Sequence, residues 1–186
     1  CLHRGGLRQP HGGHAAAHLA DRRAAVRLHR IAVQATVGGA GMGVGGGGGG
    51  LHLGFRGRAS GFCIYNDSSV AIKYMQEKYN ARVLYIDTDA HHGDGVQWSF
   101  YDDPNVCTIS IHETGRYLFP GTGNITERGT GEGFGTSFNF PVDAFTEDES
   151  FLEIYRTAFR EIVEHFKPDV ILSQNGADAH YFDPLT

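Results

Sequence analysis

The stretch that decides the fold is Asp87-Thr88-Asp89-Ala90-His91-His92-Gly93-Asp94-Gly95, which directly follows the apolar run Val83-Leu84-Tyr85-Ile86. Four apolar residues in succession indicate a strand that is covered on both faces of a parallel sheet. In an extended segment, side chains two residues apart point the same way, so Asp87, Asp89 and His91 share one face. The pattern predicts a metal site at the end of a strand. The alternative is a polar loop whose Asp residues cap the next helix.

Composition sets broad limits on the class of protein. The chain has 186 residues and a formal net charge of −5, so we expect one domain, or part of a larger one, that does not bind nucleic acid directly. Cys1, Cys63 and Cys107 have neither disulfide nor zinc-finger spacing, which is typical of reduced thiols, and we expect Cys63 and Cys107 to be buried. No apolar run approaches the roughly 20 residues that span a bilayer, and no signal peptide opens the chain. We therefore expect a cytoplasmic protein without a membrane segment.

Residues 1–50 form an atypical segment that is rich in Gly, Ala, Arg and His and contains no Phe, Tyr, Trp or Lys. Such a composition offers little material for a core. An apolar stripe favours one helix over residues 21–35. The five histidines of the segment are either a metal-binding tract or a result of its biased composition, and they are His3, His11, His14, His18 and His29.

Residues 51–186 alternate between strand and helix signals, which is typical of parallel α/β layers. The expected strands cover residues 83–87, 106–112, 137–141 and 169–173. One helix should begin after a cap at Asn66 or Asp67 and run to about Lys78, and a short one should cover residues 95–101. A longer helix should begin at a capping box formed by Thr146 and Glu149 and end before Pro168.

A second acidic segment, Asn175-Gly176-Ala177-Asp178, follows the last expected strand. In open α/β sheets, ligands bind at the carboxyl ends of the strands. Asp89, His91 and Asp178 would form a three-ligand site with open positions for water and substrate, as in catalytic zinc sites. Such oxygen-rich ligation would also admit iron or manganese. Taken alone, Asp178 could equally be a turn residue or a helix cap.

Four ordered motifs resemble the histone deacetylase family, in particular its bacterial acetoin-utilisation branch. They are Gly61-Phe62-Cys63-Ile64-Tyr65-Asn66-Asp67, residues 87–95, Phe119-Pro120-Gly121-Thr122-Gly123 and residues 175–178. The resemblance covers residues 51–186 almost continuously. It implies a partial histone deacetylase-like domain with an arginase/deacetylase-like three-layer α/β fold around a central, mainly parallel sheet. Since family members are about twice this length, we expect the chain to be an internal fragment whose fold is truncated.

The resemblance also implies roles for individual residues. Asp89, His91 and Asp178 would bind the catalytic zinc. His52 matches the first of two adjacent active-site histidines and would be held by Asp87, whereas Asp94 would orient the second histidine. Gly61, Phe62 and Phe119 match the channel that receives the acylated lysine. A structural potassium ion would be bound by backbone carbonyls around Asp87, Asp89 and His91, together with Ser110 and Ile111.

Two departures from the family bear on the chemistry. Leu53 stands where the second histidine is expected, so Asp94 loses its partner, and the catalytic tyrosine of the family would lie beyond residue 186. We therefore expect this chain to be an impaired catalyst. Residues 34–39 look like damaged remnants of the family sequence. A shifted reading frame or a badly determined gene segment would explain both residues 1–50 and Leu53.

The function implied is zinc-dependent hydrolysis of acetyl-lysine amides in proteins or peptides, with a link to acetoin utilisation. Hydrolysis of acetylated polyamines is an alternative within the same fold. A third alternative is a catalytically degenerate metal-binding module, which Leu53 favours. The arginase-like ureohydrolases share the Asp-x-His element but need further paired Asp residues, which are not found after Asp178.

Overall fold

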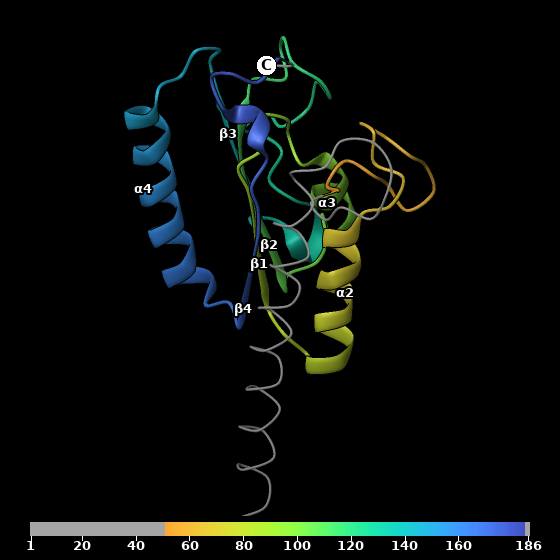
Figure 1. Cartoon of the computed structure of the whole chain (residues 1–186). Coiled ribbons are helices and arrows are strands. Elements are labelled where there is room, and N and C mark those ends of the chain that lie inside the picture. Colours follow the sequence, from red (N-terminus) through yellow and green to blue (C-terminus); the bar gives the residue numbers. More distant parts are fainter. Residues whose placement is uncertain (1–50, 185–186) are drawn as a thin grey trace, which may run out of the picture.

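The computed structural model describes residues 51–184, which form a sheet between two layers of helices (Figure 1). The helix expected over residues 21–35 and the histidine tract lie outside the described residues. Among residues 51–184, no helix is both long enough and apolar enough to cross a membrane.

The sheet has four parallel strands in the order β3-β2-β1-β4. They are β1 (Val83–Asp87), β2 (Val106–Glu113), β3 (Ser137–Val142) and β4 (Val170–Gln174). The predicted parallel sheet is confirmed, with strand bounds within about one residue of those expected. At the carboxyl end of β1, Asp87 is in register with Ser110 of β2 and Gln174 of β4. The sheet therefore delivers three polar side chains to one edge.

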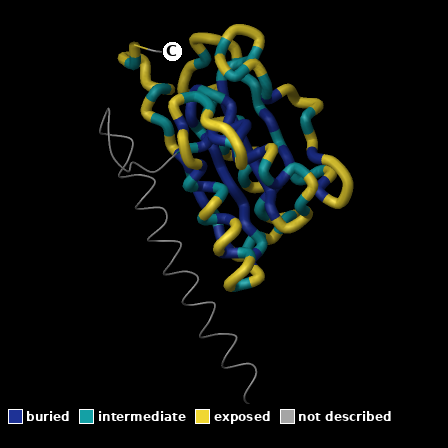
Figure 2. The backbone as a smooth tube through the Cα atoms, turned by 90° about the vertical axis from the view of Figure 1, so that its right-hand side faces the viewer, coloured by how far each residue is buried: buried dark blue, intermediate teal, exposed yellow. Residues whose placement is uncertain are grey.

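The helices cover the two faces of the sheet. α2 (Asp67–Tyr79) and α3 (Asp94–Ser99) lie on one face, and α4 (Asp148–Phe166) lies on the other (Figure 1). The 3₁₀ turns η1 (Gly131–Gly133) and η2 (Ala177–Ala179) belong to connecting segments. Two clusters of buried apolar residues fill the spaces between sheet and helices, one beside α2 and α3 and one beside α4. All five residues of β1 are buried, as the apolar run predicts for a central strand. Buried segments lie in the interior of the domain, and exposed ones lie around it (Figure 2).

The helix ends confirm one predicted cap and correct another. The Asn66 side chain accepts a hydrogen bond from Ser69 N at 2.8 Å and caps α2, as expected. The capping box of Thr146 and Glu149 is wrong, because α4 begins only at Asp148 and its N-cap residue makes no side-chain bond. Thr146 Oγ1 instead donates to Asp143 O at 2.7 Å, so a local turn uses its hydroxyl.

Cys63 and Cys107 are buried and free, as the sequence predicts. Burial raises the pKa of the Cys107 thiol to about 12, so the group stays neutral in the core. Both cysteines therefore act as small packing residues.

Candidate metal centre and active site

Segments that are far apart in the sequence meet at the carboxyl ends of β1 and β4. Thr88 N donates to Gln174 O at 3.0 Å and joins the two strand ends. Beyond them, Asp89, His91 and Asp178 each offer a ligand atom, and these atoms lie within 4.8 Å of one another. The structure therefore brings together the three residues that the sequence assigns to a metal.

Polar contacts hold this cluster in place. His91 Nδ1 lies 2.7 Å from Asp178 Oδ2 and 3.1 Å from Asp89 Oδ1. Gln174 Nε2 donates to Asp89 Oδ2 at 3.0 Å, and Ala90 N donates to Asp178 Oδ1 at 3.1 Å. A Cβ atom at Gly176 would collide with the Asp89 carboxylate, so this position has to remain without a side chain.

The electrostatics of the cluster fit a cation. Hydrogen bonds to Asp178 and then to Asp89 raise the pKa of His91 to about 10. Burial alone would raise the pKa of Asp89, but its contact with His91 and the charge of His52 outweigh burial and lower it. Two carboxylates that stabilise a proton on His91 Nδ1 would also stabilise a divalent ion at that place. One imidazole and two carboxylates make a donor set that suits zinc and also iron or manganese.

His52 and Asp87 form a buried pair beside the cluster. His52 Nδ1 lies 2.6 Å from Asp87 Oδ2, and His52 Nε2 lies 3.6 Å from Asp89 Oδ2. Burial lowers the pKa of His52, but the charge and hydrogen bond of Asp87 outweigh burial and raise it to about 9. The arrangement fixes Nδ1 as the donor to Asp87 and directs Nε2 toward the three-ligand cluster.

Asp87 is fully buried, and its oxygens accept two further hydrogen bonds. Tyr85 Oη donates at 2.7 Å, and Asp89 N donates at 3.1 Å. Gly93 completes the enclosure, because a Cβ atom there would collide with Asp87 Oδ2. The site therefore supplies donors for both oxygens of this carboxylate.

Asp94 has a different environment at the start of α3. Its Oδ1 is buried and has no hydrogen-bond partner among residues 51–184. Burial raises the pKa of this carboxyl to about 6. The segment that contains the buried Leu53 lies against the same end of α3, since Val96 N donates to His52 O at 3.2 Å.

The proposed channel residues lie on exposed loops. Gly61 and Phe62 occupy a tight turn closed by hydrogen bonds between Ser60 and Cys63, and both have positive φ values, of 50° and 62°. The Phe62 side chain is fully exposed and that of Phe119 is half exposed. In the part of the chain that the structure describes, the two rings make no aromatic contact with each other. A slot between them stays a prediction.

Ser110 and Ile111, which the resemblance assigns to a potassium site, lie near the end of β2. Ser110 is in register with Asp87, and its hydroxyl lies 2.8 Å from His112 Nδ1. The Ile111 side chain is buried. Both residues lie on the strand next to β1, and the potassium site itself stays a prediction.

Sequence reasoning missed two residues that hold this site, Tyr85 and Gln174. Tyr85 precedes Asp87 by two positions in a strand, so their shared face is a signal that could have been used. Gln174 has no such local signal, because its contact with Asp89 depends on the order of the strands.

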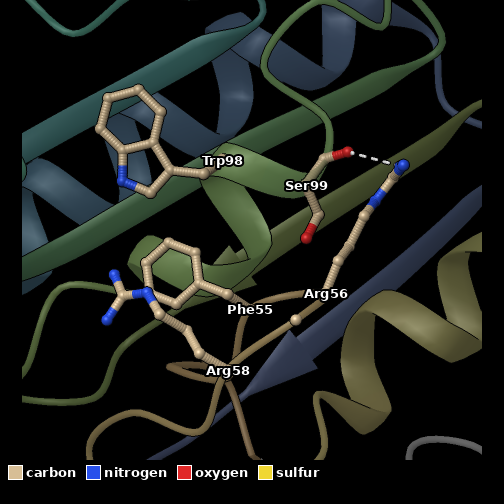
Figure 3. A pocket seen from close by; sticks show the side chains of 6 residues that line it. Phe55, Arg56, Arg58, Trp98 and Ser99 are labelled. Carbon is tan, nitrogen blue, oxygen red and sulfur yellow. Dashed lines mark hydrogen bonds between the residues drawn. The ribbon is translucent and has the colours of Figure 1, made fainter.

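A separate pocket lies beside α3 and is lined by Phe55, Arg56, Gly57, Arg58, Trp98 and Ser99 (Figure 3). The Arg58 guanidinium stacks 4.0 Å from the centre of the Phe55 ring, and Arg56 Nη2 lies 3.5 Å from Ser99 O. None of its lining residues is a candidate metal ligand. The chemistry is therefore assigned to the sheet edge and not to this pocket.

Known proteins that are similar to this chain identify its family. The sequence profile of the histone deacetylase domain matches residues 14–186. The acetoin utilization protein AcuC of Bacillus subtilis strain 168 is 77% identical over 136 residues, which are 73% of this chain and 35% of that protein. AcuC of Staphylococcus xylosus is 57% identical over 136 residues, with the same coverage. The chain thus spans about a third of the length of these curated relatives.

Solved structures show the same relationship. A crystal structure of an HDAC homolog from Aquifex aeolicus matches with a TM-score of 0.74 and 34% identity over 92% of this chain and 45% of that one. A crystal structure of an HDAC homolog complexed with SAHA has the same TM-score and identity and covers 90% of this chain and 44% of that one. The expected arginase/deacetylase-like fold is confirmed. Domain profile, relatives and structures agree that the chain belongs to the histone deacetylase family.

Proposed function

We propose that this chain carries the metal centre of a deacetylase that hydrolyses the acetyl amide of acetylated lysine in proteins or peptides. The observation that carries the proposal is the Asp89, His91 and Asp178 cluster with the His52–Asp87 pair beside it. Clustered groups with strongly shifted pKa values are typical of catalytic sites. Membership of the histone deacetylase family supports the acetylated substrate.

Asp89, His91 and Asp178 would hold the ion, with zinc as the metal proposed and iron as an alternative. When bound, zinc would supply Lewis-acid polarisation of the acetyl carbonyl and a water of lowered pKa. His91 must lose its proton to serve as a ligand, so metal uptake should release protons. We also propose a structural potassium ion near Asp87, bound by the backbone carbonyls around residues 87–91 with Ser110 and Ile111.

His52 would take a proton from the attacking water at Nε2 and return it to the lysine amine as that group leaves. The imidazole must be neutral to do so, and a cation held by Asp89 and Asp178 would lower the pKa that their charges raise. Asp87 accepts from His52 Nδ1 and keeps the imidazole in the orientation that the transfer needs. Tyr85 and the Asp89 amide hold Asp87 in turn. Gly61, Phe62 and Phe119 would form the apolar slot that takes the methylenes of the lysine.

Leu53 supports a second candidate function, a metal-binding module of the same fold without turnover. A leucine can neither accept a proton nor hydrogen-bond a water, and Asp94 Oδ1 is buried without a hydrogen-bond partner among residues 51–184. Acetylated polyamines are an alternative substrate, since a long amine would use the same slot. The relationship to AcuC supports a role in acetoin utilisation and a place in the cytoplasm.

Turnover separates these functions. The chain is stripped of metal and reloaded with zinc. Release of acetate is then measured from an acetyl-lysine peptide and from N-acetylspermidine. The proposal predicts zinc-dependent hydrolysis of the peptide, and faster hydrolysis of N-acetylspermidine would favour the polyamine alternative. One bound zinc without hydrolysis of either compound, in the parent chain and in Leu53→His alike, would support the module and contradict a deacetylase.

A further inference from the structure

The loop that carries Phe119, residues 114–130, lies on two buried histidines. The His92 and His112 rings are 4.7 Å apart, and both side chains are buried. Gly123 has a φ of 88°, and a Cβ atom there would collide with both rings. The loop backbone is thus pressed against His92, which adjoins the candidate ligand His91.

Gln97 of α3 joins three parts of the molecule. Its Oε1 accepts from His92 Nε2 at 3.1 Å. The same oxygen accepts from Ser137 Oγ at 3.0 Å and from Asn139 Nδ2 at 2.7 Å, both on β3. Its Nε2 donates to Glu127 Oε2 at 2.7 Å. One buried amide therefore connects the segment after the metal cluster, the edge strand and the loop.

The Glu127 side chain accepts hydrogen bonds from backbone amides of its own loop. Its carboxylate accepts from Gly123 N at 3.0 Å and 3.1 Å and from Asn124 N at 3.2 Å, besides the bond from Gln97. Hydrogen bonds to an ionised acceptor are stronger than neutral ones, so this carboxylate defines the loop conformation. Asn139 Nδ2 adds a bond to Glu127 O at 3.1 Å.

The donors and acceptors fix the direction of every bond in this network. Because ionised Glu127 only accepts, the Gln97 amide must donate to it and present Oε1 to His92. His92 then donates from Nε2 and accepts at Nδ1 from the Thr122 hydroxyl, 2.8 Å away. If only one of these two residues is changed from amide to carboxylate or from carboxylate to amide, at least one buried donor or acceptor loses its partner.

We propose that Gln97 and Glu127 are positioning residues, a matched amide–carboxylate pair that fixes the 114–130 loop against the segment of His91 and so sets the place of Phe119. The link from Phe119 to substrate rests on the proposed function, whereas the fixing of the loop does not.

A reciprocal exchange tests the pair. Gln97→Glu places two carboxylates, which both only accept, next to each other. Glu127→Gln directs an NH₂ group either at the NH₂ group of Gln97 or at the backbone amides of the loop, so that two donors face each other. In the double variant, the amide of residue 127 donates to the carboxylate of residue 97 and its carbonyl still accepts from the loop. Hydrogen–deuterium exchange is followed on peptides that contain Gly123 and Asn124. Binding of a fluorescein-labelled acetyl-lysine peptide is measured on the zinc-loaded protein.

Each single variant should speed exchange in the loop and weaken peptide binding by about tenfold, without loss of zinc, because it leaves a buried hydrogen-bonding partner unsatisfied. The double variant should recover to within about threefold of the parent. Gln76→Glu is the matched control, because Gln76 Nε2 donates to Asp103 Oδ2 at 2.8 Å and neither residue belongs to the 114–130 loop. This variant should leave exchange at residues 123–124 unchanged.

Unchanged exchange in both single variants, or a double variant as fast as the singles, would overturn the proposal. If one single variant does not fold, the other single variant and the double variant still test the proposal. Exchange in the loop can recover in the double variant only if residues 97 and 127 interact. Parent protein that holds zinc but does not bind the peptide would count against the proposed function, while the exchange data would still test the pair.

Discussion

Asp87 ends β1 and Asp94 begins α3, so the two buried carboxylates stand at the two ends of one loop, and they differ in their hydrogen-bond partners. Asp87 accepts from the imidazole of His52, the hydroxyl of Tyr85 and the amide of Asp89. Asp94 has an oxygen with no partner among the residues described. A buried carboxylate is tolerated where donors are supplied and is costly where they are not. The structure thus contains one complete imidazole–carboxylate pair, and we propose from the family resemblance that Leu53 stands where the imidazole of a second pair would be.

The largest expected effect comes from completing the second pair. Leu53→His should raise the rate of acetyl-lysine hydrolysis by about 100- to 10,000-fold, since the family resemblance assigns a proton-transferring imidazole to this position. Leu53→Phe fills the same space without a titratable group and serves as the control. Steady-state kinetics on both zinc-loaded variants decide. Equal rates for the two would show that the second imidazole does not matter.

Asp87→Asn and Asp94→Asn should differ in their effects on the chemistry. Asp87→Asn removes the acceptor that orients His52, and loss of such a carboxylate lowered kcat by about 10,000-fold in the serine protease triad. We expect a loss of at least about 100-fold here, against less than about threefold for Asp94→Asn. Turnover of the acetyl-lysine peptide measures both. Losses of similar size would remove the distinction between the two carboxylates.

The burial of the Asp94 carboxyl should also appear in the pH dependence of stability. The folded pKa of Asp94 is about 6, above its ordinary 3.8, so the folded state binds more protons between these values. Its contribution therefore destabilises the fold as pH rises from about 4 to 6. Asp94→Asn should raise the free energy of unfolding at pH 7.5, relative to pH 4, by about 2 kcal/mol. Urea unfolding of both proteins at the two pH values measures it, and parallel pH profiles would contradict a raised pKa.

The smallest effects should separate the two helix caps. Asn66→Ala removes the hydrogen bond to Ser69 N and should cost about 1 kcal/mol of unfolding free energy. Thr146→Ala removes only an exposed bond within a turn and should cost less than about 0.5 kcal/mol. Thermal unfolding of the two variants compares them. A larger loss for Thr146→Ala would restore the capping box.

Local sequence patterns were sufficient wherever one segment determines its own structure. The apolar run gave β1 with its exact bounds, and the side chain of Asn66 gave the start of α2. The rule that parallel strands share a ligand-binding edge brought Asp178 to Asp89 and His91.

Contacts that depend on packing between distant segments lay outside such patterns. Whether Asp94 Oδ1 finds a partner among the described residues depends on the tertiary packing at the start of α3, and the bond of Gln97 to Glu127 depends on the course of a loop. Thr146 shows the limit within one segment, because a turn with Asp143 competed for the hydroxyl that the pattern assigned to a cap.

Zinc stoichiometry tests the central claim most directly, namely that Asp89, His91 and Asp178 hold one catalytic metal. The purified chain, Asp178→Ala and the exposed control Asp102→Asn are dialysed against the same zinc buffer, and bound zinc is measured by atomic absorption. The parent and Asp102→Asn should each hold about one equivalent, and Asp178→Ala should hold almost none, because two ligands seldom retain zinc. A full, tightly held equivalent in Asp178→Ala would contradict the assignment and the deacetylase chemistry built on it.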